Sequence, residues 1–189
     1  RPGLPASELF APVYIASMTV NWSSGSLVNG GYNPAGTLYR AEISTSPDYI
    51  PVLDSSDTYN SSAEFLSLST NSAYHARVKA FNDILTETDY TALGSTYTLA
   101  VKPCAPAVPV YESVFASSMT VNWSSGPAGG YNPAGTLFSL ELATSTLFSP
   151  VAKSSRTYAL SALLTDVTPN TIYYSRVQAL SGSGSGSDF

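Results

Sequence analysis

The side chains that most often carry catalysis are scarce in this sequence. His75 is the only histidine, and strand alternation directs it outward beside Arg77 and Lys79. A histidine that acts as a general base needs a nucleophile and an orienting carboxylate within hydrogen-bond reach, and the sequence suggests no such set. One histidine and one cysteine are too few for a Cys/His zinc site, and no glycine-rich phosphate loop opens a helix. We therefore predict a protein that is not an enzyme and that carries no cofactor.

Three residues could instead make contacts with other molecules. Cys104 is the only cysteine, so it cannot form a disulfide within the chain; it either stays unpaired or cross-links to another chain. Tyr32 and Tyr131 lie in loops, where a tyrosine either packs on its own turn or contacts a sugar ring or a partner protein. We treat Cys104 as a candidate interchain thiol and the two tyrosines as candidate contact aromatics.

These residues are positioned by an internal repeat. The segment Met18–Gly25 returns as Met119–Gly126, an offset of 101 residues, and Gly30–Leu38 returns as Gly129–Leu137, an offset of 99, so the second copy lacks two loop residues. A duplication of this length indicates two copies of one domain. We place them at residues 1–101 and 102–189. In the first copy, Asp83, Glu87 and Asp89 could bind Ca²⁺ weakly, but the second copy has glycine in place of the first two, which favours solvated loop acids and no metal site.

The composition excludes several classes of partner. Charged residues are 11% of the chain, against about 25% in ordinary soluble proteins. The formal net charge is −5 and the eight basic residues are scattered, so we expect no nucleic-acid partner. No apolar run approaches the roughly 18 residues of a membrane span, so we expect no membrane insertion. Surfaces rich in Ser, Thr, Asn, Gly and Tyr are common in secreted proteins, so we expect an extracellular or cell-surface location.

Alternating apolar and polar residues predict β-strands throughout. Met18, Val20 and Trp22 share one face of a strand, and the second copy repeats the pattern. The same alternation recurs around residues 38–44 and 74–80, and no segment has a sustained helical period. Short strands separated by Gly, Pro and Asn turns predict an all-β fold, with one β-sandwich in each copy.

The segment Leu164–Ala179 resembles the fibronectin type III signature. It has an apolar strand, a Pro-Asn-Thr turn and then Tyr173, followed by Arg-Val-x-Ala; the first copy keeps Tyr74 and the Arg-Val-x-Ala. The single tryptophan of each copy matches the core tryptophan of that family. The resemblance implies two tandem immunoglobulin-like (fibronectin type III) β-sandwiches in which the tyrosine hydroxyls bond nearby backbone. The segment Asn-Pro-Ala-Gly-Thr-Leu before the third strand is similar to bacterial tandem copies of this domain.

The second copy is shorter at its end than the first. Asp188-Phe189 aligns with Asp89-Tyr90, after which the first copy continues to Val101, with its last strand expected at 94–100. We therefore expect the second sandwich to lack its last strand within this chain. Either the strand exists outside these 189 residues, or another subunit supplies it. We expect the serine- and glycine-rich run at 181–187 to be flexible. The exposed partner-strand edge would comprise four residues: Tyr174, Arg176, Gln178 and Leu180.

Two functions fit these features. The first is a non-catalytic structural or adhesive repeat module of a secreted bacterial cell-surface or filament-forming protein, which meets like copies of itself in a tandem array or homopolymer, by strand donation if the edge is used. The alternative is a spacer or carbohydrate-binding accessory module of a secreted polysaccharide-degrading enzyme, with Tyr32 and Tyr131 on the sugar.

Overall fold

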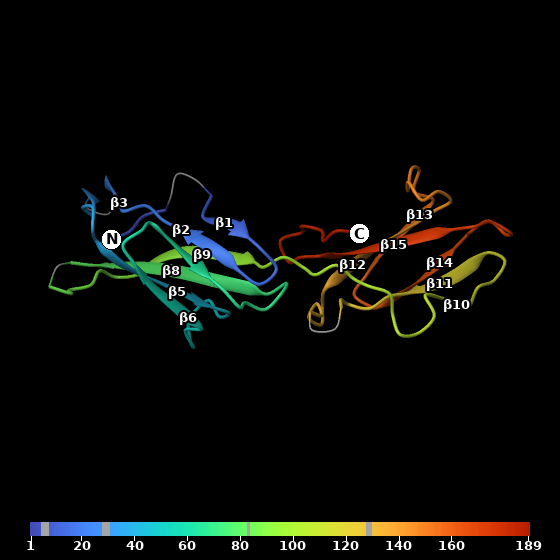
Figure 1. Ribbon diagram of the computed structural model, residues 1–189, viewed down its shortest axis with the longest axis horizontal. Helices are drawn as coiled ribbons and strands as arrows, with labels where there is room; N and C mark the ends of the chain where they lie inside the picture. Colours follow the sequence, from blue (N-terminus) through green and yellow to red (C-terminus); the bar gives the residue numbers. More distant parts are fainter. Residues whose placement is uncertain (5–7, 28–30, 83, 128–129) are drawn as a thin grey trace. The chain divides into compact units, whose positions relative to one another are not determined.

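The computed structural model describes residues 1–4, 8–27, 31–82, 84–127 and 130–189 of the chain. The chain divides into two compact units, Arg1–Thr98 (unit 1) and Leu99–Phe189 (unit 2) (Figure 1). Both units are built from antiparallel strands, as the alternating sequence patterns predict. Among the described residues no helix is long and apolar enough to cross a membrane.

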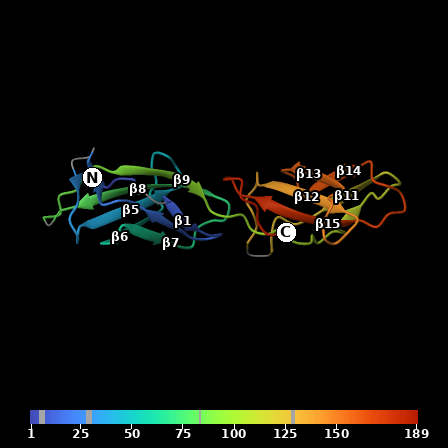
Figure 2. The same cartoon turned by 90° about the horizontal axis from the view of Figure 1, so that it is seen from above.

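Unit 1 is a sandwich of a three-stranded and a four-stranded sheet. The first sheet has the strand order β1-β2-β7, and the second has the order β6-β5-β8-β9 (Figure 2). A short hairpin of β3 and β4 precedes the second sheet. The strand bounds are β1 (Phe10–Val13), β2 (Met18–Asn21), β3 (Gly25–Ser26), β4 (Gly31–Tyr32), β5 (Leu38–Ser44), β6 (Asp54–Thr58), β7 (Ser62–Phe65), β8 (Ala73–Phe81) and β9 (Thr91–Tyr97).

Unit 2 repeats this arrangement with one strand fewer in its second sheet. Its first sheet has the order β10-β11-β14 and its second the order β13-β12-β15. The strand bounds are β10 (Tyr111–Glu112), β11 (Ser118–Asn122), β12 (Leu137–Ala143), β13 (Lys153–Thr157), β14 (Ser161–Thr165) and β15 (Tyr174–Leu180).

The inward-facing residues of the two sheets form one core in each unit. In unit 1, Met18, Val20 and Trp22 of the first sheet are buried against Tyr39 and Val78 of the second. The indole ring of Trp22 meets the ring of Tyr39 edge-on, with centroids 5.8 Å apart. In unit 2 the corresponding residues are also buried, and the rings of Trp123 and Phe138 lie 5.9 Å apart. The period-two pattern of the sequence therefore selected the buried face correctly.

The tyrosine of each signature makes the hydrogen bond that the resemblance implies. The backbone N–H of Ser69 donates to the hydroxyl of Tyr74 over 2.8 Å, and the N–H of Thr168 donates to that of Tyr173 over 2.9 Å. The N–H of Thr168 favours the phenolate form and therefore lowers the pKa of Tyr173. These bonds fix the turn before β8 and β15 in the same way in the two units.

The last strand of unit 1 begins and ends three residues earlier than the predicted 94–100. The strand stops at Tyr97 because Thr98 turns inward, where it is fully buried and bonded to the turn before β8. Ala100 packs in the core of unit 2, and the backbone of Val101 exchanges two hydrogen bonds with the Asn132 amide. Residues 99–101 therefore belong to unit 2.

Candidate partner-strand edge

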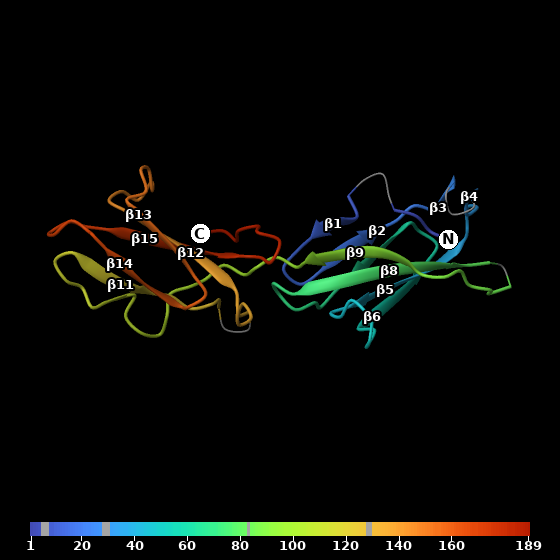
Figure 3. The same ribbon diagram turned by 180° about the vertical axis from the view of Figure 1, so that it is seen from behind.

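The two units differ most at the strand that carries the Arg-Val-x-Ala signature. In unit 1 this strand, β8, lies between β5 and β9. In unit 2 its counterpart, β15, pairs with β12, and within the described part of the chain no strand lies on its other side (Figure 3). The sequence predicted this missing strand from the alignment of the two copies.

The missing neighbour shortens β15. Ala73 and Tyr74, the first residues of β8, pair only with β9, because the β5 ladder reaches no further than His75. Their counterparts in unit 2 are Ile172 and Tyr173, and both lie outside β15, which begins at Tyr174. Two residues that are strand in unit 1 are therefore not strand in unit 2, since no strand in the described part of the chain pairs with them.

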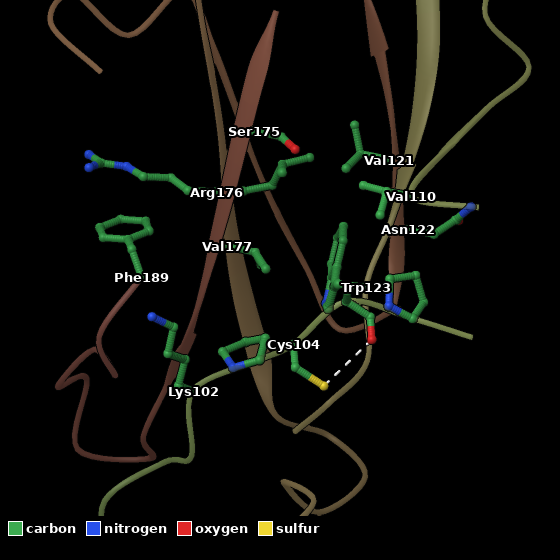
Figure 4. A pocket seen from close by; sticks show the side chains of 14 residues that line it. Lys102, Cys104, Val110, Val121, Asn122, Trp123, Ser175, Arg176, Val177 and Phe189 are labelled. Atoms are coloured by element: carbon green, nitrogen blue, oxygen red, sulfur yellow. Dashed lines mark hydrogen bonds between the residues drawn. The ribbon is translucent and has the colours of Figure 1, made fainter. Parts of the chain in front are cut away.

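The core of unit 2 opens beside this edge. A cavity of about 400 Å³ lies there, lined by Val110, Val121 and Trp123 of one layer and by Leu140 and Val177 of the other. In Figure 4, Val177 points from β15 toward Trp123, whereas Arg176 points to the opposite side, where Phe189 lies. In unit 1, Leu93 of β9 is only 2% exposed, and Val78, the counterpart of Val177, is fully buried. Val177 is only partly buried. The cavity therefore marks the place that an apolar side chain of a last strand occupies in unit 1.

Arg176 stabilises the outer face of β15. Its guanidinium bonds to the Glu141 carboxylate on β12, with Nε···Oε2 of 2.8 Å. The same guanidinium lies 4.3 Å from the ring centroid of Phe148 and 3.9 Å from that of Phe189. Arg77 of unit 1 has the same arrangement, with Glu42, Tyr49 and Tyr90 as its neighbours. Phe189 therefore occupies the place of Tyr90, the residue after which β9 begins.

The run at 181–187, expected to be flexible, forms an ordered turn instead. The N–H of Ser181 donates to the carbonyl of Ser185 over 2.8 Å, and the N–H of Ser187 donates to that of Ala179 over 2.7 Å. Gly186 forms an isolated bridge with Leu180, and a Cβ added at Gly186 would collide with the Gln178 amide. Unit 1 has the two equivalent bonds, from the N–H of Asn82 to the carbonyl of Thr86 and from the N–H of Thr88 to that of Ala80, although its sequence there is different. Backbone hydrogen bonds, which composition does not reveal, give this turn its order.

This turn limits the open part of the edge. Of the four predicted edge residues, Gln178 and Leu180 lie beside the turn at 181–187. Tyr174 is exposed and Arg176 is turned toward Glu141. The stretch equivalent to the part of β8 that pairs with β9 is Ile172–Val177. We call Ile172–Val177 the open edge.

A hydrogen bond joins the two sheets at the open edge. The hydroxyls of Tyr111 on β10 and Ser175 on β15 lie 2.9 Å apart. Unit 1 has Phe10 and Ala76 at these positions, so this contact is particular to unit 2. It connects the first sheet of unit 2 to the open edge, whereas the residues at these positions in unit 1 are apolar.

Cys104 lies beside the cavity rather than within either sheet. It forms an isolated bridge with Ser124, and its thiol donates to the carbonyl of Gly126 over 3.3 Å. The residue is exposed and its thiol is in no disulfide. Gly3 makes the equivalent bridge with Ser23 in unit 1. Because Cys104 is exposed, its thiol is accessible to another chain, and the cross-link remains a prediction.

The other candidate contact residues lie apart from the open edge. Tyr32 is 65% exposed at the end of the β3–β4 hairpin, and Tyr131 is 57% exposed in the corresponding loop of unit 2. Of the candidate calcium ligands, Asp83 lies outside the described residues, and Glu87 forms an ion pair with Lys79. No group of three His, Cys, Asp or Glu side chains gathers in the described ranges.

Three comparisons with known proteins gave one match that bears on this architecture. No family model matches the sequence, and no curated protein matches it. A two-domain fibronectin type III segment of chicken tenascin matches with a TM-score of 0.55 and 12% identity, over 100% of this chain and 95% of that segment. The FN1–FN3 domains of chicken CNTN1 match with a TM-score of 0.39 and 16% identity, over 97% of this chain and 62% of theirs. The sandwiches described above and the tenascin match together show that this chain has the fold of two fibronectin type III domains in tandem.

Proposed function

We propose that this chain is a non-catalytic structural or adhesive repeat module of a secreted bacterial cell-surface or filament-forming protein. It meets like copies by strand addition at the open edge. The observation that carries the proposal is the open edge itself: β15 has a partner on one side, and the core beside its other side is open. A sheet edge with this geometry is a template for an added strand.

The residues of the open edge favour pairing. Natural edge strands avoid association through proline, bulges or outward-reaching charges, lysine above all. The sequence from Ile172 to Val177 has no proline or glycine, and it is rich in β-branched and aromatic residues. Its single charge, on Arg176, is paired with Glu141. The open edge therefore has no proline, no glycine and no unpaired charge that would oppose pairing with another strand.

Self-association of the 189-residue chain tests this function. The matched control is an edge-filled chain, in which a second copy of residues 91–101 is fused directly after Phe189, so that unit 2 gains the strand that unit 1 has. We expect the average mass of the unmodified chain to rise with concentration in analytical ultracentrifugation, and the edge-filled chain to stay monomeric. Equal masses for the two chains at every concentration would contradict the proposal.

The exposed tyrosines support a second candidate function, an accessory or spacer module that contacts polysaccharide. Tyr32 and Tyr131 present their rings at matching places in the two units. Exposed aromatic rings stack well on the apolar faces of sugars. In a pull-down with insoluble polysaccharides, binding that is lost when Tyr32→Ala and Tyr131→Ala are combined would favour this candidate. No retention of the unmodified chain on any polysaccharide would argue against it.

A further inference from the structure

Each unit has a further sheet edge, formed by β6 in unit 1 and by β13 in unit 2. Among the described residues, each of these strands has a paired neighbour on one side only, β5 for β6 and β12 for β13. In unit 2 this edge lies across the sheet from β15 and the open edge. A strand with one neighbour has backbone groups on its other side that a further strand can pair with.

The two edge strands have nearly the same sequence, but their charges are opposite. Residues 51–59 read Pro-Val-Leu-Asp-Ser-Ser-Asp-Thr-Tyr, and residues 150–158 read Pro-Val-Ala-Lys-Ser-Ser-Arg-Thr-Tyr. Six of the nine positions are identical. Two of the others replace an acid of unit 1 by a base in unit 2, at Asp54 and Lys153 and at Asp57 and Arg156. The edge of unit 1 is therefore negative at the places where the edge of unit 2 is positive.

The backbones of the two edge strands follow the same course. Both strands cover five residues, and each pairs with its neighbour antiparallel and in the equivalent register. In the turn after each strand, the N–H of Asn60 donates to the Thr58 hydroxyl, and that of Ala159 donates to the Thr157 hydroxyl, over 3.0 Å in both units. The opposite charges therefore stand at equivalent places on two matching edges.

These charges are available to a second molecule. Within the described part of the chain, Asp54, Lys153 and Arg156 take part in no ion pair. Asp57 does have a partner, because the Arg40 guanidinium donates to both of its carboxylate oxygens over 2.7 Å. That pair is about half-exposed, and each carboxylate oxygen keeps a lone pair for a second donor.

An antiparallel alignment of β6 with β13 matches both charge pairs at once. The charges are three residues apart on each strand, so Asp57 lies opposite Lys153 whenever Asp54 lies opposite Arg156. Asp54 is on the core-facing side of β6, since its partner on β5 is the core residue Ile43. By alternation, Arg156 is on the outward side of β13. The two sandwiches would therefore lie on opposite faces of the joined sheet, which keeps their other sheets apart.

The same register also matches the exposed apolar residues that flank the two strands. It sets Tyr59 opposite Val151 and Tyr158 opposite Val52. The two tyrosines are 69% and 68% exposed, and the two valines are 40% and 39% exposed, so all four side chains are accessible. An aromatic residue opposite a β-branched one stabilises a pair of strands. Apolar pairs would therefore enclose the two charge pairs at both ends.

The charges oppose every other pairing of these two edges. Two β6 strands side by side would bring acids against acids, and two β13 strands would bring bases against bases. Like charges that lie opposite one another destabilise a strand pair, and edge strands commonly use charges to prevent association. Here the charges leave one combination favourable, which is how attraction and repulsion together give an interface its specificity.

We propose that β6 of one copy of this chain pairs antiparallel with β13 of a second copy, with Asp54 on Arg156 and Asp57 on Lys153. Each copy has one edge of each kind, so it can make two such contacts. Exposed ion pairs contribute little, so this contact does not hold two copies together at micromolar concentration; it aligns copies that are already close. The inference goes beyond the proposed function, because it involves neither β15 nor the open edge.

Disulfide trapping between two variants of the 189-residue chain tests this contact. Both variants carry Cys104→Ser; one also carries Ser55→Cys and the other, which has a mass tag, carries Ser155→Cys, two positions that face each other in the proposed register. Under mild oxidation, a non-reducing gel should show the mixed dimer forming about tenfold faster than either variant's own dimer. Equal rates would overturn the proposal. Faster trapping of Ser55→Cys by Ser154→Cys than by Ser155→Cys would overturn the antiparallel register.

Charge reversal tests whether the charges select the partner. Asp54→Lys with Asp57→Lys in the Ser55→Cys variant should slow the mixed disulfide about tenfold, and Lys153→Asp with Arg156→Asp in the other variant should restore the rate. A reversed pair that does not restore the rate would contradict the proposal. Raising NaCl from about 0.05 M to about 0.5 M should slow the original pair without any change that affects folding, and an unchanged rate would contradict the proposal as well.

The edge-filled chain separates this inference from the proposed function. It keeps β6 and β13 unchanged, so the same mixed disulfide should form in it at the same rate. Loss of the disulfide in the edge-filled chain would assign the contact to the open edge and overturn the inference. If the disulfide forms while the unmodified chain stays monomeric in ultracentrifugation, the inference is supported and the proposed function alone fails.

Discussion

Leu93→Ala should open the core of unit 1 beside β8, as the core of unit 2 is open beside β15. Leu93 is 2% exposed and packs in a core with Val78 and Tyr74. Removing a buried leucine side chain loses its transfer free energy and leaves a cavity, which together cost about 3 kcal/mol. Since whole domains are stable by only about 5–15 kcal/mol, this is a large share of the stability of unit 1.

Urea denaturation followed by tryptophan fluorescence can measure this loss, because each unit contains one tryptophan. Trp22 reports unit 1 and Trp123 reports unit 2, and Trp123→Phe or Trp22→Phe isolates each signal. In the unmodified chain we expect unit 2 to unfold at lower urea than unit 1, since its core is open. With an m-value of about 1.5 kcal/mol/M, Leu93→Ala should lower the midpoint of unit 1 by about 2 M.

The transition of unit 2 is the internal control in this experiment. It should not move, because Leu93 packs within the core of unit 1. If Leu93→Ala moves the urea midpoint of the Trp22 transition by less than about 0.5 M, the reasoning is refuted, because β9 would then contribute little to the core. A Trp123 transition at higher urea than that of Trp22 in the unmodified chain would refute the claim that the open core weakens unit 2.

Three further predictions concern single side chains. Thr98→Val should lower the free energy of unfolding of unit 1 by about 2 kcal/mol in the same urea assay, because the hydroxyl's hydrogen bonds to the carbonyl of Ser69 and from the N–H of Ser72 are lost while the volume is kept; an unchanged midpoint would contradict this. Arg40 lowers the pKa of Asp57 because its guanidinium donates a hydrogen bond to the carboxylate. The ion pair therefore contributes its full stability to unit 1 above the unfolded carboxyl pKa of about 3.9. That stability is lost as the pH falls through the lower pKa of the folded state. Asp57→Asn should therefore slightly reduce the loss of unfolding free energy between neutral and acidic pH; the effect is small because the pair is half-exposed. The same loss in the variant and the unmodified chain would contradict this prediction. Under oxidising conditions, a non-reducing gel should show a dimer that Cys104→Ser abolishes; a monomer alone would exclude the interchain thiol.

Much of the fold could be predicted from the sequence because its signals are local and occur twice. The alternation at Met18, Val20 and Trp22 fixes which face is buried, whatever the rest of the chain does. The corner tyrosines, Tyr74 and Tyr173, make the backbone bond that their motif implies. The missing last strand followed from aligning the two copies, which required no structure.

The residues that hold β9 in unit 1 could not be predicted in this way. Thr98 looks like one more hydroxyl residue in a Ser/Thr-rich chain, and only the structure shows that it is fully buried and bonded to the turn before β8. For the same reason β9 was expected three residues later than it lies. The order of residues 181–187 depends on backbone bonds to β15, and a serine- and glycine-rich composition suggests the opposite.

Amide hydrogen exchange of β15 tests the central claim most directly. The claim is that the open edge accepts a strand as β8 accepts β9. Without peptide, residues 172–177 should exchange faster than residues 73–78, because β9 pairs with β8 along 73–78 and no described strand pairs with β15 at the equivalent edge. Adding a peptide with the sequence of residues 90–101 should slow amide exchange at residues 172–177. Amide exchange at residues 73–78 should not change. Unaltered exchange at 172–177 in saturating peptide would contradict the account.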